Sequence, residues 1–310
     1  MTPPAAPGAA SILRGIVIMT AAMLIVPSMD VMAKVLTQSM PAMEVAFVRF
    51  VGQLLVAGVV GLVIGEGRRL IPPRPLGHVL RGLFLAATSL LFFSALAAMP
   101  LTDALAIAFA EPMILTALSP IFLGETIGWR RWAACGVGFL GTLIIIRPSF
   151  EQFGHVALLP LGSALTFAGY HIMTRKLSGQ GSLTAVQFTT GLVGTVALGI
   201  VLAASAGAGV LSAPVVWPQG MGWVIFLSIG VLSFVTHGMI VTAFGHAPAA
   251  VLAPFGYLEI VSATGLSLLV FGDFPDPPTW AGIGLIVASG LYIVHRERVR
   301  GRSRALPPSA

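Results

Sequence analysis

Two carboxylates that stand alone in long apolar runs are the residues best placed to do chemistry. Glu111 and Glu259 are 148 positions apart, and each lies near the middle of a helix-length apolar run. A charged side chain at the centre of a bilayer costs about 2.5–3.5 kcal/mol, so it faces a cavity or a partner, or carries a proton. We interpret the pair as lining one site that binds a cationic or hydroxylated group or carries a proton. The alternative is two neutral acids that hydrogen-bond to neighbouring helices.

Three further charged residues interrupt the first two apolar runs. Asp30 and Lys34 are spaced i, i+4 and so share one face of a helix. They form either a local ion pair that eases insertion, or an outer gate or substrate contact. Arg49 is expected near the outer end of the next helix, where it can pair with Asp30 or Glu44.

The second half of the chain places other polar residues at comparable depth. His171 follows Asp30 at an offset of 141 and is preceded by Tyr170. An imidazole titrates near neutral pH, so His171 is a candidate for proton coupling. His237 is a further candidate for the site, and Tyr257, close to Glu259, is a candidate for stacking on a flat ligand. For each of these residues the alternative is ordinary packing inside a helical bundle.

The motifs of soluble enzymes are missing or misplaced. Gly136-Val-Gly138-Phe-Leu-Gly141 matches G-x-G-x-x-G but lies inside an apolar run without a preceding strand, so close helix packing is the better interpretation. The sequence contains no Walker A motif, no metal-ligand spacing and no nucleophile elbow. We therefore expect no catalytic residues, no cofactor and no metal.

The composition indicates a membrane protein that crosses the bilayer several times. Hydrophobic residues make up 56% of the 310 residues and charged residues only 9%, and the mean hydropathy is +0.96. A typical soluble domain carries about 25% charged residues. The net charge of +6 does not indicate nucleic-acid binding, because the basic residues flank apolar runs.

Ten apolar runs are long enough, at about 20 residues, to cross a bilayer. They cover residues 13–36, 44–64, 79–98, 102–123, 129–146, 156–174, 183–204, 221–243, 248–271 and 279–295. Residues 1–12 form an N-terminal segment and 296–310 a basic tail. The predicted fold is therefore all-α, with ten transmembrane helices.

A pattern around each carboxylate occurs twice and divides the chain into two halves. Pro100, Glu111, Gly124, Glu125, Trp132 and Gly136 return as Pro248, Glu259, Gly272, Asp273, Trp280 and Gly284. We expect a first five-helix repeat over residues 13–147 and a second over 155–295. An odd number of spans inverts the second repeat relative to the first, which is a common plan of secondary transporters.

The distribution of positive charge predicts the orientation. With the N-terminus in the cytoplasm, all Lys and Arg residues except Lys34, Arg49 and Arg147 fall on the cytoplasmic side. The positive-inside rule then places both termini in the cytoplasm. The five arginines between Arg296 and Arg304 act as a positive anchor or bind anionic lipid.

Several motifs resemble the EamA family of the drug/metabolite transporter superfamily. They are the proline-led fourth span, Leu123-Gly124-Glu125, Arg130-Arg131-Trp132 and a glycine-rich fifth span. The second half departs from the Gly-Glu turn by carrying Gly272-Asp273. Ser28-Met29-Asp30 with Lys34, and Arg49-Phe50, are also similar to a subgroup that includes riboflavin and S-adenosylmethionine carriers. The resemblance implies a central cavity formed by spans 1–4 and 6–9, with spans 5 and 10 at the periphery.

These observations together predict a secondary transporter of the bacterial inner membrane that moves a small polar metabolite by alternating access. A vitamin or nucleoside-like metabolite is the expected substrate. Proton coupling, lipid contacts and a homodimer through spans 5 and 10 are further expectations. The alternatives are a broad exporter of amino acids or drugs, and a channel-like or non-transporting membrane protein.

Overall fold

The computed structural model describes residues 9–67, 70–123, 129–177, 179–207, 216, 218–247, 252, 255 and 258–305. Within these residues the secondary structure is helical, without strands. The long helices are α1 (Ala9–Thr37), α2 (Ala42–Val63), α3 (Pro75–Leu96), α4 (Leu101–Ala108), α5 (Glu111–Leu123), α6 (Trp129–Phe153), α7 (Leu159–Lys176), α8 (Leu183–Gly207), α9 (Gly222–His246), α11 (Leu258–Phe271) and α12 (Pro277–Ala305). A 3-10 turn, η2 (Gly154–Leu158), joins α6 to α7.

Seven helical stretches in this part of the chain are long and apolar enough to cross a membrane. They are Ala10–Thr37, Ala42–Val63, Pro75–Leu96, Leu101–Phe122, Ser149–Lys176, Leu183–Ser205 and Gly222–Ala243. The helix Leu258–Phe271 is apolar but shorter. The chain is therefore an all-helical membrane protein.

Two predicted spans differ from the helices found. The fourth, expected to be continuous over 102–123, is divided into α4 and α5 by a turn at Phe109 and Ala110. Pro112 explains the break, because it lacks an N–H and its ring clashes with the carbonyl four residues earlier. The fifth, expected to end before Pro148, continues as α6 to Phe153.

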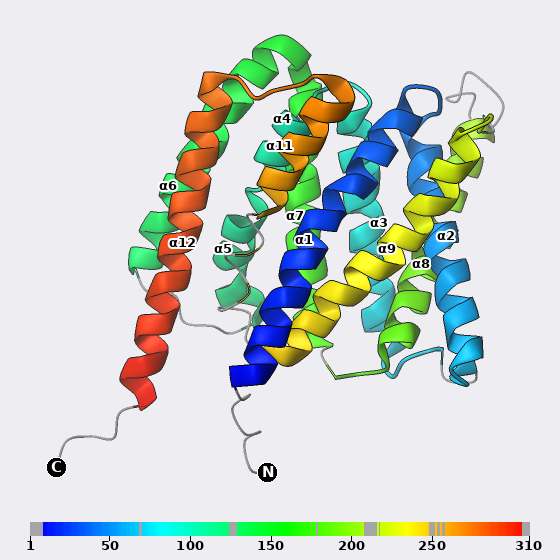
Figure 1. Ribbon diagram of the computed structural model, residues 1–310, viewed down its shortest axis with the longest axis horizontal. Helices are drawn as coiled ribbons and strands as arrows, with labels where there is room; N and C mark the ends of the chain where they lie inside the picture. Colours follow the sequence, from blue (N-terminus) through cyan, green and yellow to red (C-terminus); the bar gives the residue numbers. More distant parts are fainter. Residues whose placement is uncertain are drawn as a thin grey trace.

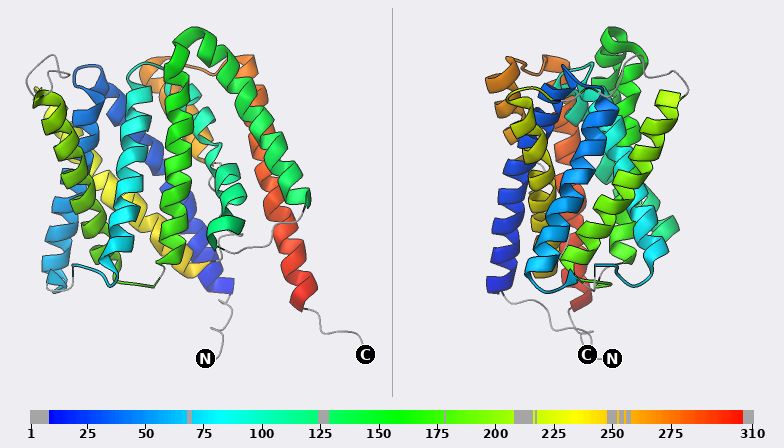
Figure 2. Two further views of the ribbon diagram at one scale, coloured as in Figure 1. Left: turned by 180° about the vertical axis from the view of Figure 1, so that it is seen from behind. Right: turned by 90° about the vertical axis from the view of Figure 1, so that its right-hand side faces the viewer.

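The helices form one bundle with a separate pair at its edge (Figure 1). In the bundle, α1 packs on α9 and α11, α7 on α3 and α5, and α2 and α3 each on α8. The pair α6 and α12 packs chiefly on itself, and the left view of Figure 2 shows it at the edge of the molecule. α1 begins and α12 ends at the same end of the molecule.

Glycine allows the closest helix contacts. A Cβ added to Gly52 of α2 would lie 2.6 Å from the Cα atom of Gly230 in α9, so the two backbones touch. In α6, a Cβ added to Gly141 would lie 2.8 Å from the carbonyl oxygen of Gly282 in α12, whereas one added to Gly136 would meet nothing within 4 Å. Within the G-x-G-x-x-G sequence of residues 136–141, Gly141 therefore allows close helix packing. At Gly136 the described part of the chain leaves room for a Cβ.

Candidate functional site

The two carboxylates lie at the start of short helices, which the sequence analysis did not predict. Glu111 opens α5, and Glu259 is in the first turn of α11. The first turn of a helix has unpaired N–H groups and a partial positive charge, and both favour a carboxylate. In Figure 1, α11 occupies the half of the bundle remote from the chain ends and α5 the other half. The N-terminal turns of both helices thus lie near mid-height in this view.

Glu111 contacts His171 across the two halves of the chain. The Oε1 atom of Glu111 is 3.1 Å from Nδ1 of His171. The two side chains are 12% and 27% exposed, respectively. The imidazole also lies 4.4 Å from the ring of Phe167, centre to centre. This contact brings together two of the predicted site residues, from α5 and α7.

Asp30 and Glu259 lie on two helices that pack on each other. Asp30 is buried in α1, and Glu259 lies in the first turn of α11. The hydroxyl of Ser262, three residues after Glu259, donates to the carbonyl of Leu24 at 2.8 Å, so α1 and α11 are in direct contact near this acid.

Arg49 is fixed by neutral partners. Its Nε donates to Ser233 Oγ at 3.1 Å, one terminal nitrogen donates to the Ser89 hydroxyl, and the other lies 3.4 Å from Nε2 of His237. The expected pairing with Glu44 does not occur, because that carboxylate accepts hydrogen bonds from the backbone N–H of Val216 instead. A buried guanidinium with hydroxyl partners retains capacity to bind an anionic group.

Tyr170 belongs to an aromatic group beside these charges. Its ring stacks on Phe167 at 5.6 Å with an angle of 2° between the planes, and it meets the ring of His237 edge-on at 6.5 Å. The guanidinium of Arg81 lies over the same ring at 5.5 Å.

Arg81, expected among the charges on the cytoplasmic side, has contacts that the sequence did not indicate. The residue is buried and donates to Thr190 Oγ1 at 2.6 Å and to the Val186 carbonyl at 3.1 Å. It therefore links α3 to α8.

Lys34 binds a different partner from the one the sequence suggested. Its Nζ lies 2.8 Å from Oδ2 of Asp273 and 4.5 Å from the ring centre of Phe271. The neighbouring acid Asp276 caps α12, since its Oδ1 accepts the N–H of Thr279 at 2.8 Å. Lys34 therefore ties the end of α1 to the segment between α11 and α12.

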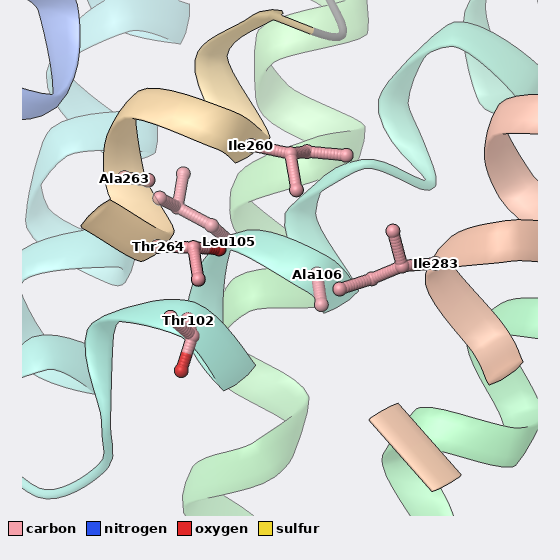
Figure 3. Close-up of a pocket in the computed structure, with 7 residues that line it drawn as sticks. All are labelled: Thr102, Leu105, Ala106, Ile260, Ala263, Thr264 and Ile283. Atoms are coloured by element: carbon pink, nitrogen blue, oxygen red, sulfur yellow. The ribbon is translucent and has the colours of Figure 1, made fainter. Parts of the chain in front are cut away.

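The region between α4, α11 and α12 is almost filled (Figure 3). It contains a cavity of about 10 Å³ lined by Thr102, Leu105, Ala106, Ile260, Ala263, Thr264 and Ile283. Such a volume holds about one water molecule and excludes a metabolite.

Two predicted features remain to be placed. Tyr257 lies outside the described residues. Among the residues that the structure does describe, no group of three or more His, Cys, Asp or Glu side chains is arranged to hold a metal ion.

Comparison with known proteins identifies the family. The EamA-like transporter family matches residues 13–147 and 154–295. The S-adenosylmethionine uptake transporter of Rickettsia bellii (strain RML369-C) is 29% identical over 270 residues, covering 87% of this chain and 89% of the relative. The riboflavin transporter of Rhizobium johnstonii is 31% identical over 231 residues, or 74% of each chain.

Two further proteins are similar to this chain, one in sequence and one in structure. The pseudopaline exporter CntI of Pseudomonas aeruginosa is 27% identical over 279 residues, covering 87% of this chain and 92% of the relative. One solved crystal structure superposes with a TM-score of 0.63 at 20% identity, over 92% of this chain and 97% of that chain, and shares the fold. As the sequence motifs predicted, the chain belongs to the EamA-like transporter family and is a transporter of small metabolites rather than an enzyme.

Proposed function

We propose that this protein is a secondary transporter of the bacterial inner membrane that carries S-adenosylmethionine or a closely similar cationic nucleoside. Ten spans in two inverted five-helix repeats, with both termini in the cytoplasm, would move the substrate by alternating access. The central site would comprise Glu111, His171, Asp30, Glu259 and Arg49. Tyr170 and His237 would complete its wall.

The helix contacts support an inverted repeat. If α1, α2, α3, α5 and α6 correspond to α7, α8, α9, α11 and α12, every major contact has a counterpart. The packing of α1 on α9 is mirrored by α7 on α3, that of α1 on α11 by α7 on α5, and that of α2 on α9 by α8 on α3. In the pairs α2–α8 and α6–α12, each helix is the counterpart of the other, so the exchange of halves leaves these contacts unchanged. Two unrelated halves would not show matching contacts of this kind.

The same correspondence relates the charged pairs. Glu111 with His171 is the counterpart of Glu259 with Asp30, because each pair joins a helix start to the first helix of a repeat. One pair thus consists of an acid and a base, and the other of two acids. Two carboxylates that share an apolar site disfavour each other's ionisation, and a bound cation relieves that repulsion.

The choice of substrate rests on Asp30 and Glu259, two acids on helices that pack on each other. S-adenosylmethionine has a sulfonium and an ammonium group for Asp30 and Glu259. Its carboxylate fits the guanidinium of Arg49, and its adenine fits the rings of Tyr170 and Phe167. Riboflavin, the substrate in the name of another relative, has a flat ring but no cation, so it would not use the two acids.

The conformation supports alternating access with the outer side closed. On the proposed orientation, the Lys34–Asp273 ion pair and the filled region between α4 and α11 lie toward the outside. The side chains of Glu111 and His171 are partly exposed. Proton coupling would use this second pair, because an imidazole and a carboxylate in contact can exchange a proton as access changes.

The test compares two ligands that differ in a single charge. S-adenosylhomocysteine lacks the methyl group and therefore the sulfonium charge. Because a hydrogen bond or contact with a charged group contributes about 1.5–3 kcal/mol, we expect the purified protein to bind S-adenosylmethionine about 10- to 100-fold more tightly, as measured by calorimetry.

Two substitutions test whether Glu259 causes the preference for S-adenosylmethionine over S-adenosylhomocysteine. Glu259→Gln should reduce it to about threefold or less. Glu151→Gln, at an exposed acid of α6, should leave it unchanged. Equal affinity for both ligands in the wild type, or tight binding of riboflavin alone, would refute the proposed substrate.

A further inference from the structure

A groove lies between the beginning of α6 and the middle of α12, away from the candidate site. It has a volume of about 310 Å³. Its lining includes Trp129, Ala133 and Val137 from α6 and Ala288, Ser289 and Tyr292 from α12. The small side chains at its centre leave the space open. The groove is apolar apart from Ser289 and the polar atoms of its two aromatic residues.

The two aromatic residues mark the level of the groove in a membrane. The side chains of Trp129 and Tyr292 are 74% and 43% exposed, respectively. Both residue types are enriched where hydrocarbon meets the polar headgroups, because each has an apolar ring and one polar atom. The groove therefore extends from the headgroup level into the hydrocarbon region.

Positive charge gathers at the same end of the two helices. Arg130 and Arg131 lie in the first turn of α6, and Arg296, Arg298 and Arg300 follow Tyr292 along α12. Arg296 is four residues beyond Tyr292, or about 6 Å along the helix. The segments 129–146 and 284–305 contain only one acidic residue, Glu297. An anionic headgroup above an acyl chain fits this arrangement of charge and apolar surface.

We propose that this groove is a binding site for an anionic phospholipid. One acyl chain lies between Ala133 and Ala288, and the phosphate group lies at the level of the first turn of α6, near the end of the groove where the sequence carries its arginines. The inference rests on the proposed ten-span topology, in which α6 and α12 cross the membrane. A narrow hollow between two helices suits a flexible chain better than a second copy of this protein, which would have to present a matching ridge.

The experiment is native mass spectrometry of the full chain in detergent. Phosphatidylglycerol and phosphatidylcholine with identical acyl chains are titrated separately onto delipidated protein. We expect one phosphatidylglycerol to bind at least tenfold more tightly than phosphatidylcholine. Arg130→Gln with Arg131→Gln should weaken phosphatidylglycerol binding about fivefold for each arginine removed. The matched control, Arg175→Gln with Lys176→Gln at the exposed end of α7, should have no effect.

A second pair of variants tests the groove itself. Ala133→Phe fills it and should reduce phosphatidylglycerol binding at least fivefold. Leu143→Phe, at an exposed position of α6 outside the lining, should not. If Ala133→Phe yields no folded monomer, the arginine variants decide.

Three results would overturn the proposal. They are equal binding of the two lipids, lipid binding indifferent to the arginine variants, and a wild-type dimer that Ala133→Phe dissociates. The measurement needs no transported substrate, so its failure is distinct from failure of the proposed function. A negative result in the lipid titration would refute the lipid site and would not affect the calorimetric comparison of S-adenosylmethionine with S-adenosylhomocysteine.

Discussion

Replacing Asp273 by Asn should open the outer side of the transporter. Asp273 lies between α11 and α12 and binds Lys34 at the end of α1, with Nζ and Oδ2 2.8 Å apart. On the proposed mechanism, this ion pair exists only while the outer side is closed. Its loss therefore raises the free energy of the closed state and leaves the open state unchanged, which shifts the population toward the open state.

The magnitude follows from the geometry and the exposure of the pair. Two unit charges 2.8 Å apart interact by about 1.5 kcal/mol in water and about 6 kcal/mol at an effective dielectric constant of 20. Lys34 is 12% exposed and Asp273 32%. Solvent screening and the cost of desolvating Lys34 both reduce the net effect, so we expect about 1–2 kcal/mol. This corresponds to a shift of about 5- to 30-fold in the equilibrium.

Lys34→Ala should have a larger effect than Asp273→Asn. The ammonium group also lies 4.5 Å from the ring centre of Phe271. A cation–π contact at a partly exposed site contributes about 0.5–1 kcal/mol. The double variant should resemble Lys34→Ala, because the ion pair can be lost only once.

Cysteine labelling measures the shift directly. The only native cysteine, Cys135, is replaced by Ser, and a single cysteine is introduced at Thr102, which is buried in the small cavity between α4 and α11. A membrane-impermeant maleimide is added to intact spheroplasts, where it reaches only the outer side. Asp273→Asn should raise the labelling rate about tenfold, and Glu151→Gln should not change it.

Exchange of the two charges provides the decisive control. Lys34→Asp with Asp273→Lys restores the attraction and should return the labelling rate to within about threefold of its original value. Unchanged labelling in both single variants would refute the gating role of this ion pair. Increased labelling that the exchange does not reverse would mean that the variants disturb packing rather than a charge contact.

The remaining predictions concern the site and the packing. His171→Gln keeps a hydrogen-bonding partner for Glu111 but cannot carry a proton, so transport in proteoliposomes should continue and lose its dependence on a pH gradient; an unchanged dependence would exclude this pair as the proton carrier. Gly52→Ala should lower the melting temperature measured in detergent by an amount equivalent to about 1–3 kcal/mol, because the added Cβ would meet the backbone of Gly230. Gly136→Ala, which meets nothing, should be neutral or slightly stabilising.

The sequence predicted those features well for which a residue type at a given position has only one physical explanation. An acid in the middle of an apolar run must be sheltered, and Glu111 indeed contacts His171. That Glu111 and Glu259 line one site stays a prediction. The motifs around Gly124 and Arg130 were enough to predict the family that the comparison shows.

The sequence did not predict which side chains form ion pairs between distant helices. Lys34 and Asp273 are 239 positions apart, and nothing local distinguishes that pair from Lys34 with Asp30. Helices that face lipid on one side and protein on the other are apolar all round, so periodicity did not reveal which residues face inward. The burial of Arg81 was not foreseen for this reason. The break before Glu111 was foreseeable from Pro112, but its position at the start of a separate helix required the structure.

The difference between the two halves suggests how one symmetric backbone can serve two tasks. In the proposed repeat, Asp30 and His171 occupy corresponding positions, so the exchange of one acid for an imidazole breaks the symmetry of the site. Glu111 then has its own base, whereas Glu259 faces a second acid and needs a cation. On the proposed mechanism, the substrate cation would bind at Glu259 and the proton at the pair formed by Glu111 and His171. In the proposed site both glutamates take part, so occupation of one position changes the affinity of the other, and such reciprocal coupling is what exchange of a substrate for a proton requires.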